Sequence, residues 1–415
     1  MKQLTRLFIP ICLETLFYML SGMVDTLMLS AVGDYAVGAV GTANSYIGIF
    51  IIMFSIISSG MVSVMTQNIG AGRPGVAYQA RQLGLLFNAV AGVLMAVFLF
   101  SGAGAILRMV GIADALYEPA LIYLKIVGGG CILNAVIPIF SSYLRAFGYT
   151  KQPLYATIVG NIANFVMNAV FLFVLHKGVA GVAAATVISK ILNLCIVLYF
   201  SHKLISAKNS TERIANKTVL GQIVKVGLPS ACETALYNVA MMLVIRFLNQ
   251  MDAEGLNVTA RSYTATISNF SYCVGAALAQ ANAIMTGWHI GAGELEECDR
   301  GTKRAAFVGV CVAVCMETAI VLGSGFIMPL FTDNPEMTAL VRKLLAIDIV
   351  LEIGRVTNLV FGQALKTSGD AVFPAVIAAV FMFVFAVGGT WLFGISMGLM
   401  AVGAYIGLAL SLIHI

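Results

Sequence analysis

The stretch Pro10-Ile-Cys-Leu-Glu14-Thr15-Leu-Phe-Tyr18 returns 219 residues later as Pro229-Ser-Ala-Cys-Glu233-Thr234-Ala-Leu-Tyr237. Two more stretches recur in the same order, each displaced by 221 residues: Ile69-Gly70-Ala71-Gly72 as Ile290-Gly291-Ala292-Gly293, and Arg145…Gly148…Pro153 as Lys366…Gly369…Pro374. One match would mean little in so apolar a chain, because composition alone creates similarity. Three matches at a nearly constant displacement indicate an internal repeat, and therefore two related halves.

The composition places both halves in a membrane. Of the 415 residues, 60% are hydrophobic and only 10% are charged, whereas a soluble domain carries about 25% charged residues. Mean hydropathy is +0.94. Apolar runs long enough to cross the hydrocarbon core recur along the chain. Membrane-spanning strands would be shorter and would alternate with period two, and that pattern is absent. The sequence therefore predicts an all-α polytopic membrane protein.

Eleven of the apolar runs are complete, at residues 7–30, 39–67, 83–106, 119–142, 153–175, 179–201, 226–249, 256–287, 305–327, 340–363 and 374–394. A twelfth begins near residue 398 and continues to the end of the sequence. Because the repeat sets Gly178–Phe200 against a segment that starts at Gly398, we expect this last helix to be truncated. The prediction is twelve transmembrane helices in two pseudo-symmetric six-helix bundles.

The expected domains follow from the repeat. They are an N-terminal bundle over residues 1–201, a cytoplasmic linker over 202–224 and a C-terminal bundle over 225–415 that is incomplete at its end. An even number of helices in each half means that both halves enter the membrane from the same side. The axis that relates them then lies along the membrane normal, and transporters use such repeats to rock two bundles around a site near the midplane.

Lysine and arginine are distributed unequally between the expected loops. With the N-terminus inside, 15 of the 24 lie in inner termini and loops and 5 in outer loops, while Lys125, Lys190, Arg261 and Arg355 lie within spans. Basic loops stay cytoplasmic, so the net charge of +5 reports topology and not a nucleic-acid partner. We expect a monomeric, multi-pass protein of the plasma membrane with a cytoplasmic N-terminus, whose partners are the lipid bilayer and a small-molecule substrate.

Six acidic side chains fall within expected spans: Glu14, Asp25, Glu233, Glu317, Asp348 and Glu352. An ionised carboxylate in lipid costs at least a few kcal/mol, so such residues face a cavity, pair with a cation or take up a proton. Asp25 is distinctive because its repeat counterpart is the apolar Val244. Glu14 and Glu233 are repeat counterparts, each four residues after a proline that can free a backbone carbonyl. They fit either ion coupling or helix packing.

Polar residues cluster on two other expected helices. Asp348, Glu352 and Arg355 lie at positions i, i+4 and i+7, which fits an internal ion-pair network or a cavity wall. Asn164 and Asn168 share one face with Asn161, which fits interhelical hydrogen bonds or the lining of a polar pathway.

Three further charged residues stand apart from these clusters. Arg261 and Lys190 are candidates to pair with internal carboxylates that the sequence does not identify. Glu317 lies alone in its span, and we expect it to pair structurally.

Five short motifs occur in a fixed order: Val24-Asp25-Thr26, Gly70-Ala71-Gly72-Arg73, the segment RAFGYTKQP at 145–153, Gly227-Leu-Pro229, and LKTSGD at 365–370. In order and spacing they resemble the multidrug and toxic compound extrusion (MATE) family, from about residue 5 onward. The resemblance implies a V-shaped pair of bundles that exports cationic, amphipathic compounds in exchange for H⁺ or Na⁺, with no other cofactor.

The resemblance also implies roles for single residues. The family's first-helix aspartate, which carries the proton or sodium ion, falls at Asp25, so the resemblance is compatible with a Na⁺ site there and implies no other metal. In one branch a seventh-helix glutamate and a tenth-helix aspartate fall at Tyr237 and Arg355. In another, an Asn-x-x-x-Asp pair falls at Asn164 and Asn168. Our candidates for the cavity or substrate site are Asn164, Asn168, Tyr237, Asp348, Glu352, Arg355 and Arg261.

The leading functional hypothesis is therefore antiport by alternating access, with Asp25, Glu14 and Glu233 as candidates for ion coupling. A flippase for lipid-linked sugars or lipids is the alternative, and the basic residues Arg261, Arg355 and Lys125 within spans are compatible with it. A membrane-embedded enzyme is disfavoured. The four histidines, His176, His202, His289 and His414, are scattered at loops or the chain end and form no catalytic cluster.

Overall fold

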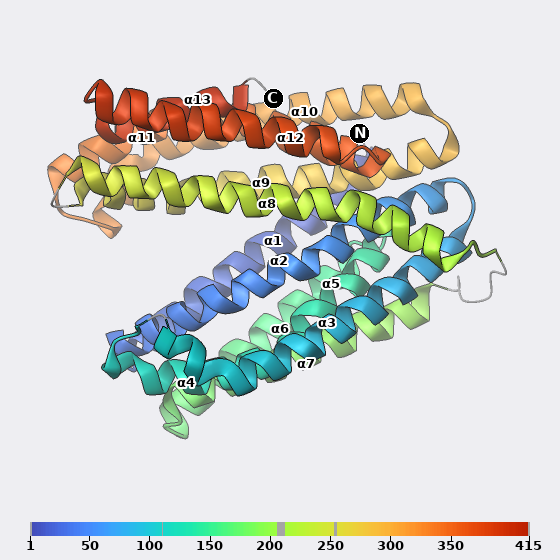
Figure 1. Ribbon diagram of the computed structural model, residues 1–415, viewed down its shortest axis with the longest axis horizontal. Helices are drawn as coiled ribbons and strands as arrows, with labels where there is room; N and C mark the ends of the chain where they lie inside the picture. Colours follow the sequence, from blue (N-terminus) through green and yellow to red (C-terminus); the bar gives the residue numbers. More distant parts are fainter. Residues whose placement is uncertain (1, 110, 206–211, 253–254, 414–415) are drawn as a thin grey trace. The chain divides into compact units, whose positions relative to one another are not determined.

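The computed structural model describes residues 2–109, 111–205, 212–252 and 255–413, which are almost entirely helical and contain no strand. The predicted all-α class is confirmed. The long helices (Figure 1) are α1 (Lys2–Ser30), α2 (Asp34–Gly70), α3 (Pro74–Met109), α4 (Asp114–Gly129), α5 (Cys131–Ala146), α6 (Lys151–Ala169), α7 (Gly178–Leu204), α8 (Asn216–Met251), α9 (Leu256–Ala292), α10 (Leu295–Ile327), α11 (Pro335–Ser368), α12 (Val372–Phe381) and α13 (Met400–Ile413). Shorter helical segments are η1 (Val170–Val174), η3 (Met328–Leu330), η4 (Met382–Val387) and η5 (Thr390–Ser396).

The expected spans coincide with these helices, with one difference. The span predicted at residues 119–142 consists of two helices, α4 and α5, which meet at an angle of 41° around Gly130. Among the described helices, eight are long and apolar enough to cross a membrane, or nine if this bent pair counts as one span. Helices α9 and α11 are not among the eight, and α11 is the helix that carries Asp348, Glu352 and Arg355.

The contacts divide the chain into two units. The N-terminal unit comprises residues 9–228, and the C-terminal unit comprises residues 1–8 together with 229–415. The two divisions fall within α1 and α8, next to the repeat prolines Pro10 and Pro229. Proline removes a backbone hydrogen bond from a helix interior and weakens it there. The domain boundaries expected from the repeat stay a prediction.

Within the N-terminal unit, α2 crosses the first turns of α8 at a pair of glycines. A Cβ atom built on Gly60 would lie 1.9 Å from the carbonyl oxygen of Ile223, and one on Gly227 would lie 1.8 Å from that of Ile56. Any side chain at either position would collide with backbone. Small residues allow such close approach in membrane bundles, so this pair of glycines fixes where α8 begins to pack on the unit.

The core of the C-terminal unit contains the position that corresponds to Asp25. Val244 on α8 is fully buried and packs in a cluster with Leu248, Leu344 and Leu345. The repeat therefore places an apolar core residue in one unit where the other unit carries an aspartate. Because the shared fold accommodates valine at this position, the fold alone does not account for the aspartate at position 25.

Candidate functional site

The first polar cluster lies within the N-terminal unit and is built around Asp25. Its Oδ1 atom accepts a hydrogen bond of 2.8 Å from Nδ2 of Asn168 on α6, and the same amide lies 3.2 Å from Oδ1 of Asn164. Both asparagines are buried, whereas Asp25 is half-buried. The i, i+4 spacing of the asparagines puts both side chains on one face, so α6 presents an amide pair to the carboxylate. The structure thus brings together three of the residues selected from the sequence.

A lysine completes this cluster. Nζ of Lys190 on α7 donates a hydrogen bond of 2.8 Å to Oδ1 of Asn134 on α5, and its charge interacts with that of Asp25. The buried Tyr123 of α4 also lies near Asp25 and beside Thr186 of α7. Asp25 forms no salt bridge of its own within the described residues. Its direct hydrogen-bond partner is the neutral amide of Asn168, while the Lys190 ammonium acts on it through charge alone.

The two other acids proposed for ion coupling have direct basic partners. Glu14 Oε1 lies 2.6 Å from Nη2 of Arg145, and Glu233 Oε2 lies 2.8 Å from Nζ of Lys366. The partners are themselves repeat counterparts, so the same ion pair is formed once in each unit. An ion-coupling role for Glu14 and Glu233 stays a prediction, and the pairing gives each of them a structural role as well.

The second polar cluster lies within the C-terminal unit, where α9, α10 and α11 pack against one another. Asp348 and Glu352 are buried on α11, with 2% and 0% of each side chain exposed. Arg355 donates a hydrogen bond from Nη1 to Glu352 Oε1, and its Nη2 lies 3.7 Å from Asp348 Oδ1. The spacing i, i+4, i+7 thus forms an ion-pair network along one helix.

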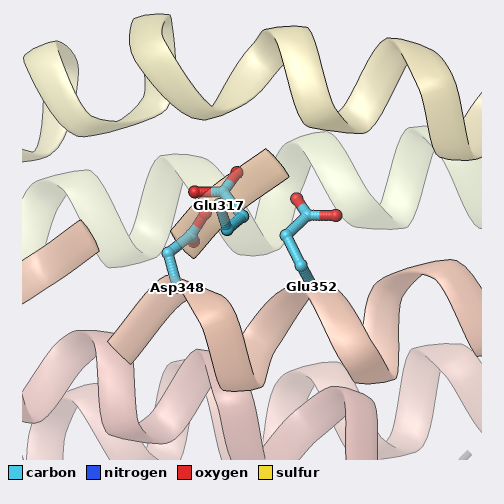
Figure 2. A group of neighbouring side chains, drawn as sticks. All are labelled: Glu317, Asp348 and Glu352. Atoms are coloured by element: carbon cyan, nitrogen blue, oxygen red, sulfur yellow. The ribbon is translucent and has the colours of Figure 1, made fainter. Parts of the chain in front are cut away.

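Glu317 of α10 joins this cluster, where Ser271 of α9 and the two acids of α11 are its neighbours. The structural pairing expected for it stays a prediction. It is fully buried, and it forms no salt bridge with any basic side chain in the described part of the chain. One carboxylate oxygen of each of Glu317, Asp348 and Glu352 lies within 4.8 Å of the other two. Figure 2 shows the carboxyl groups of Glu317 and Asp348 directed toward one another, with Glu352 beside them on α11. Among the described residues the cluster thus contains three carboxylates and one basic side chain, Arg355.

The remaining candidates lie near this second cluster. Arg261 of α9 donates to the sulfur of Met241 at 3.7 Å and forms no salt bridge among the described residues. Its charge acts on Tyr405 of α13. Tyr237 of α8 is half exposed, and it interacts electrostatically with Arg355. Tyr405 also interacts with Asp348, so both Arg261 and Tyr237 are linked electrostatically to members of the second cluster.

Sequence reasoning missed Asn134 and the position of Lys190 beside Asp25. A signal for Asn134 existed in the repeat, because it lies 221 residues before Arg355, the displacement that also relates Arg145 to Lys366. No signal linked Lys190 to Asp25, since the two residues lie on helices that are far apart in the sequence.

Comparison with known proteins relates the chain to a family. The family model MatE matches residues 10–170 and 229–392. The uncharacterized transporter YisQ of Bacillus subtilis (strain 168) is 32% identical over 403 residues, which cover 96% of this chain and 88% of the relative.

Solved structures agree in fold. An outward-facing multidrug resistance MATE family transporter of the MOP superfamily has a TM-score of 0.86 at 20% identity, covering 100% of this chain and 92% of that one. A MOP superfamily transporter from Pyrococcus furiosus Vc1 (DSM3638), described as having a binding pocket of reversed polarity, has a TM-score of 0.85 at 20% identity, covering 100% and 93%. At these identities the likeness shows a common fold.

Proposed function

Because the chain belongs to the MatE family of membrane transporters, we propose that it exports cationic, amphipathic small molecules by ion-coupled antiport, with alternating access to the two sides of the plasma membrane. The N-terminus is cytoplasmic in this proposal, in keeping with the basic inner loops. The protein acts as a monomer. Its family relatives are transporters and not enzymes, which supports a role without chemical conversion of the substrate.

Asp25 is the coupling residue in this proposal, and one observation carries it. Glu14 and Glu233 each have a basic partner within 2.8 Å, whereas Asp25 is held by the neutral amide of Asn168. A carboxylate in a membrane-spanning helix without a direct counter-charge gains most from binding a small cation. If the two conformations bind that cation with different affinity, its entry drives the change that releases substrate.

The surroundings of Asp25 favour H⁺ over Na⁺. The oxygens of Asp25, Asn164 and Asn168 are ligands that suit Na⁺, and together they could hold it. However, the Lys190 ammonium already interacts with Asp25, and a second cation beside it meets like-charge repulsion. A proton bound to the carboxylate neutralises it without adding a separate charge. We therefore take H⁺ as the coupling ion.

The test is efflux of a fluorescent cation from proteoliposomes, driven in separate arms by a pH gradient and by a Na⁺ gradient. The parent should export the dye under the pH gradient and not under the Na⁺ gradient. Asp25→Asn should abolish the efflux driven by the pH gradient while the purified variant keeps the thermal unfolding profile of the parent. Asp299→Asn, which removes an exposed acid paired with Lys303, is the control and should keep full activity. Unchanged efflux by Asp25→Asn overturns the assignment, and efflux driven by Na⁺ alone overturns the choice of H⁺.

The flippase alternative requires a cationic cavity. Arg355 does not supply one, because it is engaged by Glu352 and Asp348. Arg261 and Lys125 form no salt bridge among the described residues, but they belong to different units, so each unit holds one of them. A lipid-translocation assay that shows activity, beside absent dye efflux, would reverse this preference.

A further inference from the structure

The acidic cluster of the C-terminal unit has an unbalanced charge. Glu317, Asp348 and Glu352 are three buried carboxylates, and the one cation within salt-bridge distance of any of them is Arg355, among the described residues. If all three are ionised, the cluster has a formal charge of −2. Isolated charge in a membrane interior costs several kcal/mol or more. The cluster therefore requires a positively charged ligand, or protons.

Four carboxylate oxygens are left for such a ligand. Arg355 engages Oε1 of Glu352 and lies near Oδ1 of Asp348. Both oxygens of Glu317, Oδ2 of Asp348 and Oε2 of Glu352 are buried and have no hydrogen-bond donor of suitable geometry among the described residues. The hydroxyls of Ser271 and Ser268 lie beside Glu317 and Asp348 without reaching that geometry. Such orphaned buried acceptors are rare in folded proteins, and each one calls for an explanation.

Two serines of α9 give an independent indication of a ligand. Ser262, Thr264 and Thr266 donate their hydroxyls to backbone carbonyls four residues earlier, as serine and threonine in helices commonly do. Ser268 and Ser271 do not, although they are 3% and 0% exposed. Ser271 instead lies beside Glu317, and Ser268 lies beside Asp348. Both hydroxyl groups therefore lie against carboxylates of the acidic cluster.

We infer that these oxygens of α9, α10 and α11 form a binding site for a hard metal cation of the size of Na⁺ or Ca²⁺. Carboxylate and hydroxyl oxygens are ligands that such cations prefer. Ca²⁺ binds oxygen at about 2.3–2.6 Å, so oxygens on opposite sides of it are about 4.6–5.2 Å apart, whereas Mg²⁺ requires about 4.0–4.2 Å. The spread of up to 4.8 Å among the three carboxylates admits the larger ions without rearrangement.

This site is separate from the coupling residue and does not depend on the proposed antiport. It uses Glu317, Asp348 and Glu352 of the C-terminal unit, whereas Asp25 belongs to the N-terminal unit. It also differs from the positions that the family resemblance implies for this unit, where Tyr237 and Arg355 stand in place of acids. A cation here would tie three helices of one unit together.

The experiment is thermal unfolding of the purified full-length protein in detergent, in choline chloride, with Na⁺ or Ca²⁺ added in separate arms at constant ionic strength. A ligand that binds the folded state raises the melting temperature in a saturable way. We expect one of the two cations to do so, and Glu317→Gln to weaken that cation's apparent affinity at least tenfold. The surface variant Asp299→Asn is the control and should respond like the parent. Asp25→Asn tests whether the cation binds at the coupling residue instead.

A second variant separates binding from folding. Ser271→Ala removes one proposed ligand oxygen without changing charge, and it too should weaken the affinity, measured by equilibrium dialysis with radioactive Na⁺ or Ca²⁺. Glu317→Gln should melt no lower than the parent in choline chloride, because it removes an uncompensated charge. The inference is overturned if neither cation binds the parent, if binding survives both variants, or if Asp25→Asn alone abolishes it.

Discussion

Glu14 of α1 and Arg145 of α5 form an ion pair of 2.6 Å, with only 12% and 16% of their side chains exposed. The repeat reproduces this pair in the C-terminal unit, where Glu233 and Lys366 lie 2.8 Å apart. The segments 10–18 and 145–153 carry the two residues of this pair, and both segments recur in the second half of the sequence. Their charged residues recur together because they form the same ion pair in each unit. An interaction present in both units is better explained by the architecture that they share than by a function confined to one of them.

Glu14→Gln should therefore destabilise the protein without removing ion coupling. The variant removes the carboxylate that pairs with the largely buried Arg145 guanidinium. Breaking a buried pair in this way costs about 3–5 kcal/mol, less where solvent or another contact of the guanidinium compensates its charge. Thermal unfolding should show the loss, and the exchanged pair Glu14→Arg with Arg145→Glu should recover part of it. Efflux normalised to folded protein should persist. If efflux disappears while the melting temperature is unchanged, Glu14 is a coupling residue after all.

Gly227→Ala should disrupt the packing of α8 on α2. The added methyl group would meet the carbonyl oxygen of Ile56 at 1.8 Å, and backbone cannot move aside as a flexible side chain can. Overpacking of this kind costs about 1–3 kcal/mol or more. Gly221→Ala on the same helix is the matched control, because nothing lies within 4 Å of its added Cβ. Melting temperatures and yields of folded protein should fall only for Gly227→Ala, and equal behaviour of both variants would contradict the close crossing.

The sequence was sufficient for the helices and their duplication. Span lengths follow from the apolar runs, and the repeat follows from short motifs at a constant displacement. The bend at Gly130 was not predicted, because the run at 119–142 is apolar on both sides of it. Hydropathy reports how well a segment tolerates lipid, and it contains no information on local helix direction.

The sequence predicts contacts between residues of one helix, but it does not predict the contacts between helices that complete the two polar clusters. Asp348, Glu352 and Arg355 lie on one helix, so helical periodicity alone brings them together. Glu317 was expected to find a structural partner, but its neighbours come from α9 and α11, and no pattern within α10 indicates them. Lys190 and Asp25 interact in space, but most of the sequence of the N-terminal unit lies between them. Interactions between helices depend on tertiary packing, which the pattern of a single sequence does not specify.

Asp252→Ala should weaken the start of α9 in a pH-dependent way. Burial alone would raise the pKa of Asp252, but hydrogen bonds from Asn257, Leu256 and Gly255 outweigh it and hold the pKa below its ordinary value of 3.8. A lowered pKa in the folded state adds stability above the unfolded value, and this stability is lost as the pH falls through the folded pKa. Asn257 in turn accepts a hydrogen bond of 3.1 Å from the backbone of Ala401, so the same turn holds α13.

Melting temperatures of the parent and of Asp252→Ala, measured from pH 7 downward, should therefore differ by the equivalent of about 0.5–2 kcal/mol, as for other helix-start residues. The difference should shrink below pH 3.8. Asp333→Ala removes an exposed aspartate from the loop before α11 and serves as the control, with no pH-dependent difference expected. A difference for Asp252→Ala that is constant over this range would assign the effect to packing instead.

Lys190→Gln should change which ion drives efflux. In the parent the ammonium interacts with Asp25 and opposes a second cation, whereas glutamine keeps a donor for Asn134 and removes the charge. The oxygens of Asp25, Asn164 and Asn168 would then face a site without a resident cation. We expect a Na⁺ gradient to drive dye efflux in the variant and not in the parent. Lys203→Gln, at the exposed end of the same helix, should leave ion preference unchanged. Retention of strict H⁺ dependence by Lys190→Gln would mean that the geometry around Asp25, and not the neighbouring charge, selects the ion.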